Sequence, residues 1–128
     1  MASIYLAGRF SKRFLHQGYR GELQRRGHTV TSRWIDIATE NEGDALKCAR
    51  IDLEDLNLSD TVIAFGDVPR STRSRGGHWV EYGYALASGH RIMLVEYREN
   101  IFGHLPEIEF FDSWPKALDA LTPMRKAA

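Results

Sequence analysis

Residues 3–11 read Ser-Ile-Tyr-Leu-Ala-Gly-Arg-Phe-Ser, and this stretch decides the fold of the chain. Its first five residues, Ser3–Ala7, form a mostly apolar run, which is typical of a strand buried on both faces of a parallel sheet. The glycine that follows is typical of a turn from a strand into a helix. Thr61–Phe65 and Arg91–Tyr97 are similar runs, so the sequence predicts a sheet with buried parallel strands at its centre.

Strands and helices alternate along the chain. His28–Trp34 and Ile108–Phe111 complete five predicted strands. The helical patterns between and after them cover Ser11–Arg26, Glu42–Leu58, His78–Ser88 and Ser113–Leu121. This alternation predicts an α/β fold, with a parallel sheet and helices on both of its faces. In such sheets ligands bind beyond the carboxyl ends of the strands, and we expect the site residues there.

The composition of the 128 residues fits one domain, which we assign to residues 1–128. Lys plus Arg equals Asp plus Glu at 17 each, which argues against a protein that binds nucleic-acid polymers. A single cysteine, Cys48, excludes an internal disulfide, and the five histidines lack metal-ligand spacing. We expect no metal and no organic cofactor. The apolar runs are too short for a signal peptide or a membrane span, so we expect a cytoplasmic protein without a membrane partner.

Glu81 lies on a largely apolar helix face, because Tyr84 and Ala85 are its i+3 and i+4 neighbours. The helix begins beside Gly76 and Gly77, where a glycine turn lets a ligand approach the backbone. A carboxylate on a packed face beside such a turn is a candidate nucleophile. We expect the helix N-terminus and hydrogen bonds in the pocket to keep it ionised.

Asp52 is the second carboxylate in an unexpected place, because it shares the apolar stripe of its helix with Cys48 and Leu56. An unpaired charge there would be costly, so Asp52 either forms a structural ion pair or belongs to a site. Asp55, nearer another face, is expected to be solvated. Two misplaced carboxylates indicate glycosidic-bond cleavage, in which one attacks or stabilises the sugar and the other handles the leaving group's proton.

Several residues near the predicted carboxyl ends of the strands are candidates for substrate binding. Tyr5 either packs in the core or uses its hydroxyl to position a carboxylate. The turn Gly8-Arg9-Phe10 suits an anion at the start of a helix. Trp34 either stacks on a nucleobase or packs in the core.

The loop before the glycine pair, Arg70–Arg75, carries three arginines and three hydroxyls. It is either a phosphate clamp or a solvated surface loop. We include Arg75, Gly76, Gly77 and His78 among the candidate substrate-binding residues, since His78 directly follows the two glycines.

Three blocks of sequence together resemble the nucleoside 2-deoxyribosyltransferase superfamily, which includes 2'-deoxynucleoside 5'-monophosphate N-hydrolases. The first is Ile4-Tyr5-Leu6-Ala7-Gly8. The second places Asp52 eight residues before Asp60-Thr-Val-Ile-Ala. The third is Gly77-His-Trp-Val-Glu-Tyr-Gly-Tyr-Ala-Leu. The resemblance spans roughly residues 3–97, with the order and spacing of the blocks intact.

The resemblance implies a flavodoxin-like, doubly wound, five-stranded parallel sheet and a double-displacement reaction on a nucleoside or nucleoside 5'-monophosphate. Glu81 matches the nucleophile that forms a glycosyl ester, Asp52 the aspartate that helps the departing base take up a proton, and Tyr5 the tyrosine that orients the nucleophile. In a retaining reaction of this kind the two carboxyls lie about 5–5.5 Å apart. A homodimer or higher homo-oligomer is also implied.

The identity of the sugar acceptor stays open at the level of sequence. The tail Pro123–Ala128 lacks the C-terminal asparagine with which transferases of this group complete a neighbouring site. The sugar passes either to another base or, in a hydrolase, to water. A non-catalytic nucleotide-binding or sensing domain on the same fold is the alternative of another class. The apolar run Ile101–Phe111 either forms a self-association interface or packs within the monomer.

Overall fold

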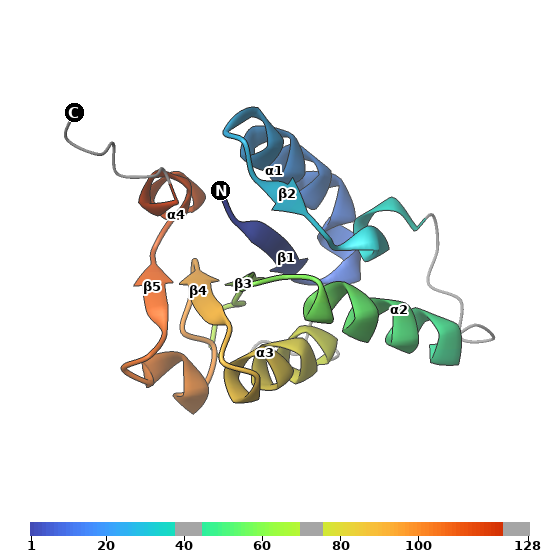
Figure 1. Cartoon of the computed structure of the whole chain (residues 1–128). Helices are drawn as coiled ribbons and strands as arrows, with labels where there is room; N and C mark the ends of the chain where they lie inside the picture. Colours follow the sequence, from blue (N-terminus) through green and yellow to red (C-terminus); the bar gives the residue numbers. More distant parts are fainter. Residues whose placement is uncertain (38–44, 70–75, 122–128) are drawn as a thin grey trace.

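Five strands form one parallel sheet in the order β2-β1-β3-β4-β5. The computed structural model describes residues 1–37, 45–69 and 76–121. The strands are β1 (Ser3–Ala7), β2 (Thr29–Val30), β3 (Thr61–Phe65), β4 (Arg91–Val95) and β5 (Glu109–Phe111). The helices are α1 (Arg13–Arg25), α2 (Ala45–Asn57), α3 (Gly77–Ala87) and α4 (Trp114–Ala120). This single α/β domain confirms the predicted fold class and the doubly wound sheet (Figure 1).

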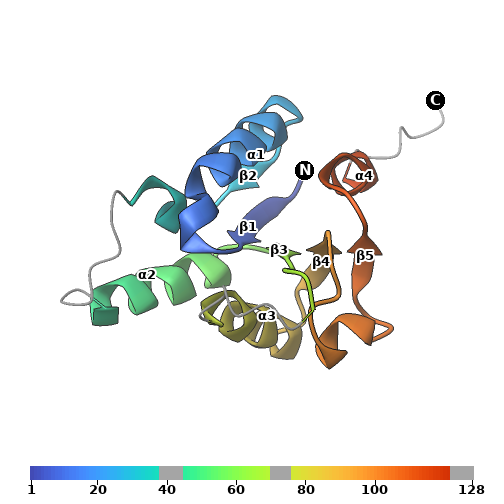
Figure 2. The ribbon, with the colours of Figure 1, turned by 180° about the vertical axis from the view of Figure 1, so that it is seen from behind.

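The helices cover both faces of the sheet, as the two opposite views show (Figures 1 and 2). On one face α1 and α4 pack over Ile4, Leu6 and Ile63. On the other face α2 and α3 pack over Tyr5 and Val62. Each central strand is therefore buried on both sides, which explains its continuous apolar sequence.

The crevice between β1 and β3 is the point where the winding of the sheet reverses. After β1 the chain crosses to α1 on one face, whereas after β3 it crosses to α3 on the other face (Figure 1). The connection that leaves β1 and the connection that leaves β3 therefore run to opposite faces of the sheet, starting from the carboxyl ends of these two neighbouring strands. This is the position at which doubly wound sheets bind their ligands.

The predicted strand His28–Trp34 is wrong in its length, because only Thr29–Val30 forms β2. Beyond it the Thr31 N–H still donates to the Ile4 carbonyl at 2.8 Å, and side chains then replace backbone pairing. Ser32 Oγ accepts from the Leu6 N–H at 3.1 Å, and Trp34 Nε1 donates to the Leu6 carbonyl at 2.7 Å. The chain then turns into a short 3-10 helix, η2 (Arg33–Asp36), instead of continuing as a strand.

Other predicted boundaries differ from the structure by a few residues. Ser11–Arg26 divides into a 3-10 helix, η1 (Phe10–Lys12), and α1. The strand predicted to reach Tyr97 stops at Val95, because Glu96 turns the chain with a φ of 81°. The start predicted for the second long helix lies at residues 42–44, outside the described residues.

Candidate active site

Tyr5 and Glu81 meet on the α3 face of the sheet. Tyr5 points from the middle of β1 toward this face and is fully buried. Its hydroxyl donates a hydrogen bond to Glu81 Oε2. Burial, followed by the nearby Glu81 and Asp52 carboxyls, raises the pKa of Tyr5 far above its usual range, so the hydroxyl keeps its proton and remains a donor.

Burial raises the pKa of Glu81 to about 8. The hydrogen bond from Tyr5 lowers this pKa and the charge of Asp52 raises it, but both effects are smaller than the effect of burial. The expectation that the helix N-terminus and hydrogen bonds keep Glu81 ionised is therefore wrong for the protein without substrate at neutral pH. Glu81 lies in the second turn of α3, beyond the strongest part of the helix dipole.

Asp52 projects from α2 toward the same region, and its charge acts on Glu81. It is half-buried, and burial followed by repulsion from Asp55 raises its pKa to about 6. Asp52 Oδ1 has no hydrogen-bond partner within the described parts of the chain. The carboxyl of Asp52 is thus poised to exchange a proton, and its predicted separation from Glu81 stays a prediction.

Asp55 is buried, contrary to the expectation that it is solvated. Its Oδ2 accepts from the backbone N–H of Arg33 at 2.9 Å, and its Oδ1 accepts from Arg33 Nε at 2.9 Å. The guanidinium comes from η2, far from Asp55 in sequence, and compensates the buried charge. Asp55 therefore ties η2 to α2 and is the structural carboxylate of this helix.

The turn after β1 holds the predicted residues Gly8, Arg9 and Phe10. Arg9 Nε lies 3.3 Å from Asp67 Oδ2, and this ion pair is largely shielded from solvent. Gly8 needs to be glycine, because a Cβ there would lie 2.5 Å from His16 Nε2. The turn at the carboxyl end of β1 is therefore held by Asp67 on one side and packs against His16 on the other. Contact of these residues with substrate stays a prediction.

Trp34 has only 7% of its surface exposed and belongs to the core on the Tyr5 face. Its ring centroid lies 5.0 Å from that of His16, and its indole N–H is bound to Leu6. Core packing therefore accounts for Trp34, and base stacking by its ring stays a prediction.

The predicted residues before Glu81 form the beginning of α3. Gly76 adopts a φ of 85°, in the left-handed region that favours glycine, and Gly77 is the first helical residue. His78 is buried in the first turn, and burial lowers its pKa although Glu99 opposes this. Arg75 lies outside the described residues.

Neither the models of known protein families nor the sequences of curated proteins match this chain. Solved structures do match. A 2-deoxyribosyltransferase from Leishmania mexicana is 18% identical with a TM-score of 0.74, and the match covers 95% of this chain and 97% of the other. A 2-deoxyribosyltransferase from Bacillus psychrosaccharolyticus is 21% identical with a TM-score of 0.71, over 99% of this chain and 100% of the other. The CMP N-glycosidase BcmB from Clostridium botulinum is 23% identical with a TM-score of 0.61, over 93% of this chain and 97% of the other.

This chain has the 2-deoxyribosyltransferase fold. The matches extend over nearly the whole length of both partners in each comparison. The resemblance to the nucleoside 2-deoxyribosyltransferase superfamily, read from three short blocks of sequence, is thus confirmed at the level of the fold.

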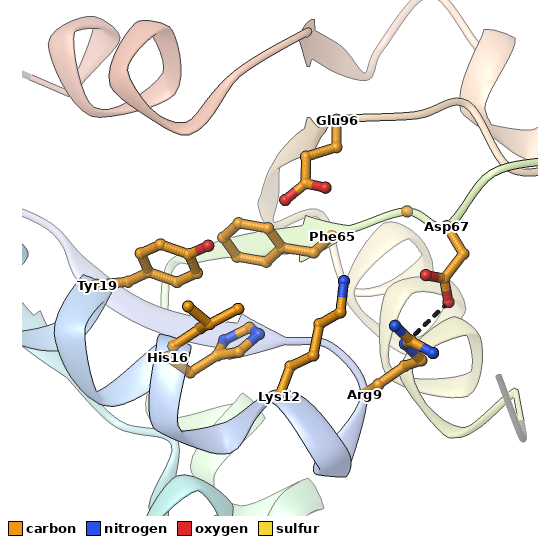
Figure 3. A pocket seen from close by; sticks show the side chains of 9 residues that line it. Arg9, Lys12, His16, Tyr19, Phe65, Asp67 and Glu96 are labelled. Atoms are coloured by element: carbon orange, nitrogen blue, oxygen red, sulfur yellow. Dashed lines mark ion pairs between the residues drawn. The ribbon is translucent and has the colours of Figure 1, made fainter. Parts of the chain in front are cut away.

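A shallow hollow lies between α1 and the carboxyl ends of β3 and β4 (Figure 3). The residues that line it include Arg9, Lys12, His16, Tyr19, Phe65 and Glu96. Phe65 belongs to the core under α1 and α4, whereas Tyr5 and Ala85 belong to the core under α3. Burial lowers the pKa of His16 to about 3, so its ring is neutral and packs as a core aromatic. Two cations, Arg9 and Lys12, and two carboxylates, Asp67 and Glu96, line the hollow, whereas Glu81 does not.

Glu99 is a half-buried group of the site region that the sequence pattern does not single out. It lies in the loop after β4, where its side chain is 13% exposed and bonds to the loop after β3 and to α3. Its position beyond the carboxyl end of a central strand is the one signal that could have identified it.

Within residues 1–37, 45–69 and 76–121, no group of three or more His, Cys, Asp or Glu side chains could hold a metal ion. In the same ranges, each helix falls short of the length and apolar character that a membrane crossing requires.

Proposed function

We propose that this protein cleaves the N-glycosidic bond of a (deoxy)nucleoside or its 5'-monophosphate through a covalent glycosyl-Glu81 intermediate and transfers the sugar to another base. One observation carries this proposal: the Tyr5 hydroxyl binds one oxygen of Glu81 beside the half-buried carboxyl of Asp52. The likeness to two 2-deoxyribosyltransferases supports it at the level of the fold.

In the first step, Glu81 Oε1 attacks the anomeric carbon of the sugar while Tyr5 holds Oε2. The bond from carbon to the base nitrogen breaks, and its electron pair leaves with the base. Asp52 gives its proton to the departing base, and the sugar is left as an ester of Glu81. The core residues around Glu81 exclude water, which strengthens the stabilisation of the oxocarbenium-like transition state by the carboxylate.

In the second step, a nitrogen of another base attacks the anomeric carbon, and the ester bond to Glu81 breaks. The proton lost by the incoming base returns to Asp52, so both carboxyls recover their starting states. The reacting form needs one proton on Asp52 and none on Glu81. With pKa values of about 6 and about 8, the two groups together hold about one proton at neutral pH. Before substrate binds, this proton lies mainly on Glu81, and it moves to Asp52 to give the reacting form.

Hydrolysis is the second candidate, with water in place of the second base. The likeness to the CMP N-glycosidase BcmB favours it, as does the basic sequence Arg70–Arg75, which could receive a 5'-phosphate. The chemistry at Glu81, Asp52 and Tyr5 is the same in both reactions. The two differ in whether water or a base reaches the glycosyl ester first.

A product assay by chromatography tests the proposal. The protein is incubated with deoxynucleosides, ribonucleosides and their 5'-monophosphates, each with and without a second base. A new nucleoside that forms only with added base indicates the transferase, and free base without added acceptor indicates the hydrolase. We expect Glu81→Ala to be inactive and Glu107→Ala, which changes an exposed glutamate, to retain activity. If the wild-type protein binds these substrates but releases no base, the chain is a nucleotide-binding domain instead.

A second copy of the chain is the partner we propose for the outer face of α2 and α3. Leu46 and Val80 on this face are 66% and 69% exposed. The two helices also contact each other. Sedimentation velocity of a Leu46→Asp, Val80→Asp variant should show a monomer, whereas Phe14→Asp on α1 should sediment as the wild type does.

A further inference from the structure

Glu99 joins two loops and a helix beside the candidate active site. Its Oε1 accepts a hydrogen bond from the backbone N–H of Asp67 at 2.7 Å, in the loop after β3. Its Oε2 accepts from the indole Nε1–H of Trp79 at 2.9 Å, in the first turn of α3. One side chain therefore fixes the end of β3 relative to the start of α3.

The contacts of Glu99 continue in both directions. Asp67 Oδ2 lies 3.3 Å from Arg9 Nε, so the turn after β1 belongs to the same network. On the other side, His78 Nε2 lies 3.6 Å from Glu99 Oε1. The turns beyond three central strands and the first turn of α3 thus meet around the carboxyls of Glu99 and Asp67.

The beginning of α3 depends on this support from outside the helix. Its N-cap residue is Gly76, which has no side chain to bind the first backbone N–H groups, and the next residue is also glycine. Two successive glycines restrict the backbone less than other residues do. Trp79, held by Glu99, precedes Glu81 by only two positions, so a shift of the first turn would move the Glu81 carboxyl relative to Tyr5.

We propose that Glu99 is a positioning residue for Glu81, which it holds against Tyr5 by anchoring Trp79 in the first turn of α3. Its importance for a reaction rests on the proposed function, but its effect on Glu81 is measurable without any substrate. Glu99 is not in contact with the Tyr5–Glu81 pair in this role; it acts through the helix.

The test is a ¹³C NMR titration of the Glu81 side-chain carboxyl, assigned with Glu81→Gln, in the wild type and in Glu99→Gln. The glutamine amide has one acceptor oxygen, whereas the Asp67 N–H and the Trp79 indole N–H each need one. One of these two hydrogen bonds is therefore lost. We expect a looser first turn, more water at Glu81, and a midpoint that falls from about 8 by about one pH unit. The control is Glu109→Gln, which changes a carboxylate of β5 that binds Arg91 at the surface.

Trp79→Phe tests the same contact with a smaller change, since it removes the indole N–H and keeps an aromatic ring. We expect a shift of the Glu81 midpoint in the same direction and of smaller size. An unchanged midpoint in folded Glu99→Gln and Trp79→Phe would overturn the proposal and leave Glu99 as a purely structural residue. A shifted midpoint in a protein that releases no base from any substrate would support the positioning role while refuting the proposed function.

Discussion

The hydroxyl of Tyr5 reaches across 76 positions of sequence to donate a hydrogen bond to Glu81. Tyr5 lies in the central strand β1, and Glu81 lies in the second turn of α3, a helix that begins with glycines. The bond favours the ionised form of Glu81, whereas burial favours the protonated form more strongly. Burial therefore makes Glu81 a weak acid, with a pKa of about 8.

Tyr5→Phe should impair the reaction by removing a hydrogen bond that favours ionised Glu81. We expect kcat/KM at pH 7 to fall by about ten- to a hundredfold, as is typical for a hydrogen bond to a charged group. The pKa of Glu81 should rise further, since Tyr5 lowers it. The measurement is a pH profile of kcat/KM. Tyr84→Phe removes a hydroxyl that binds Asn57 at 2.6 Å, and it should leave the profile unchanged.

The wild-type pH profile should be bell-shaped, because the reacting form holds one proton on the two carboxyls. The value of kcat/KM should rise as the first proton leaves near pH 6 and fall as the second leaves near pH 8. Asp52→Asn should lower kcat/KM by about a hundredfold or more, through loss of the proton donor. It should also remove the alkaline limb and move the remaining ionisation below 8, since Asp52 raises the pKa of Glu81.

A substrate with a good leaving base separates the roles of Asp52. Such a base departs with little need for a proton, so it should restore most of the activity of Asp52→Asn. Equal losses for good and poor leaving bases would contradict proton donation by Asp52.

Glu81→Gln should stabilise the fold at alkaline pH. The folded-state pKa of Glu81 is raised from 4.5 to about 8, so the folded protein holds this proton more tightly than the unfolded chain does. Protonated Glu81 therefore stabilises the fold fully below pH 4.5. This stabilisation decreases as pH rises from 4.5 to about 8, and above about pH 8 the loss does not grow further. We expect the free energy of unfolding of the variant to exceed that of the wild type by about 2–4 kcal/mol at pH 9, with little difference near pH 4.

Urea denaturation at several pH values measures this effect. Glu109→Gln is the matched control, because Arg91 lowers the pKa of Glu109 and gives the opposite sign. That carboxylate stabilises the fold above its unfolded pKa, and the contribution is lost as pH falls through the folded value. A gap between Glu81→Gln and the wild type that does not change with pH would refute the raised pKa.

Arg33→Ala should destabilise the protein by leaving the buried carboxylate of Asp55 without its cation. The Arg33 side chain is 53% exposed and that of Asp55 2%, so solvent screens part of the loss. We expect a clear decrease in the free energy of unfolding, because the carboxylate left without its cation is buried. Arg20→Ala removes a surface pair with Asp36 and should cost less than about 1 kcal/mol. Equal effects of the two variants in urea denaturation would contradict a structural role of Asp55.

The sequence predicts those parts of the molecule that depend on local pattern. The apolar run Ser3–Ala7 is continuous because both of its faces are covered, and this property is visible without the structure. Tyr5, Asp52 and Glu81 stand out because each places a polar group on an apolar face. The sequence predicts a role for all three, and the structure brings Tyr5 and Glu81 into contact.

The remaining features depend on partners that are distant in sequence. The burial of Asp55 follows from Arg33 on another element, which no helical pattern reveals. The early end of β2 follows from side-chain bonds of Ser32 and Trp34 to Leu6. Glu99 lies in an irregular loop without periodicity, so only its contacts identify it.

The short outer strands of the sheet limit how copies of this chain can meet. β2 spans two residues and β5 three, and beyond β2 side chains take the place of backbone partners. Long, flat border strands serve as templates on which further strands add, and such templates lead to fibrils and other uncontrolled aggregates. The short edge strands β2 and β5 offer few backbone groups to which a further strand could bind. The self-association that we propose therefore relies on contacts between helices and not on added strands.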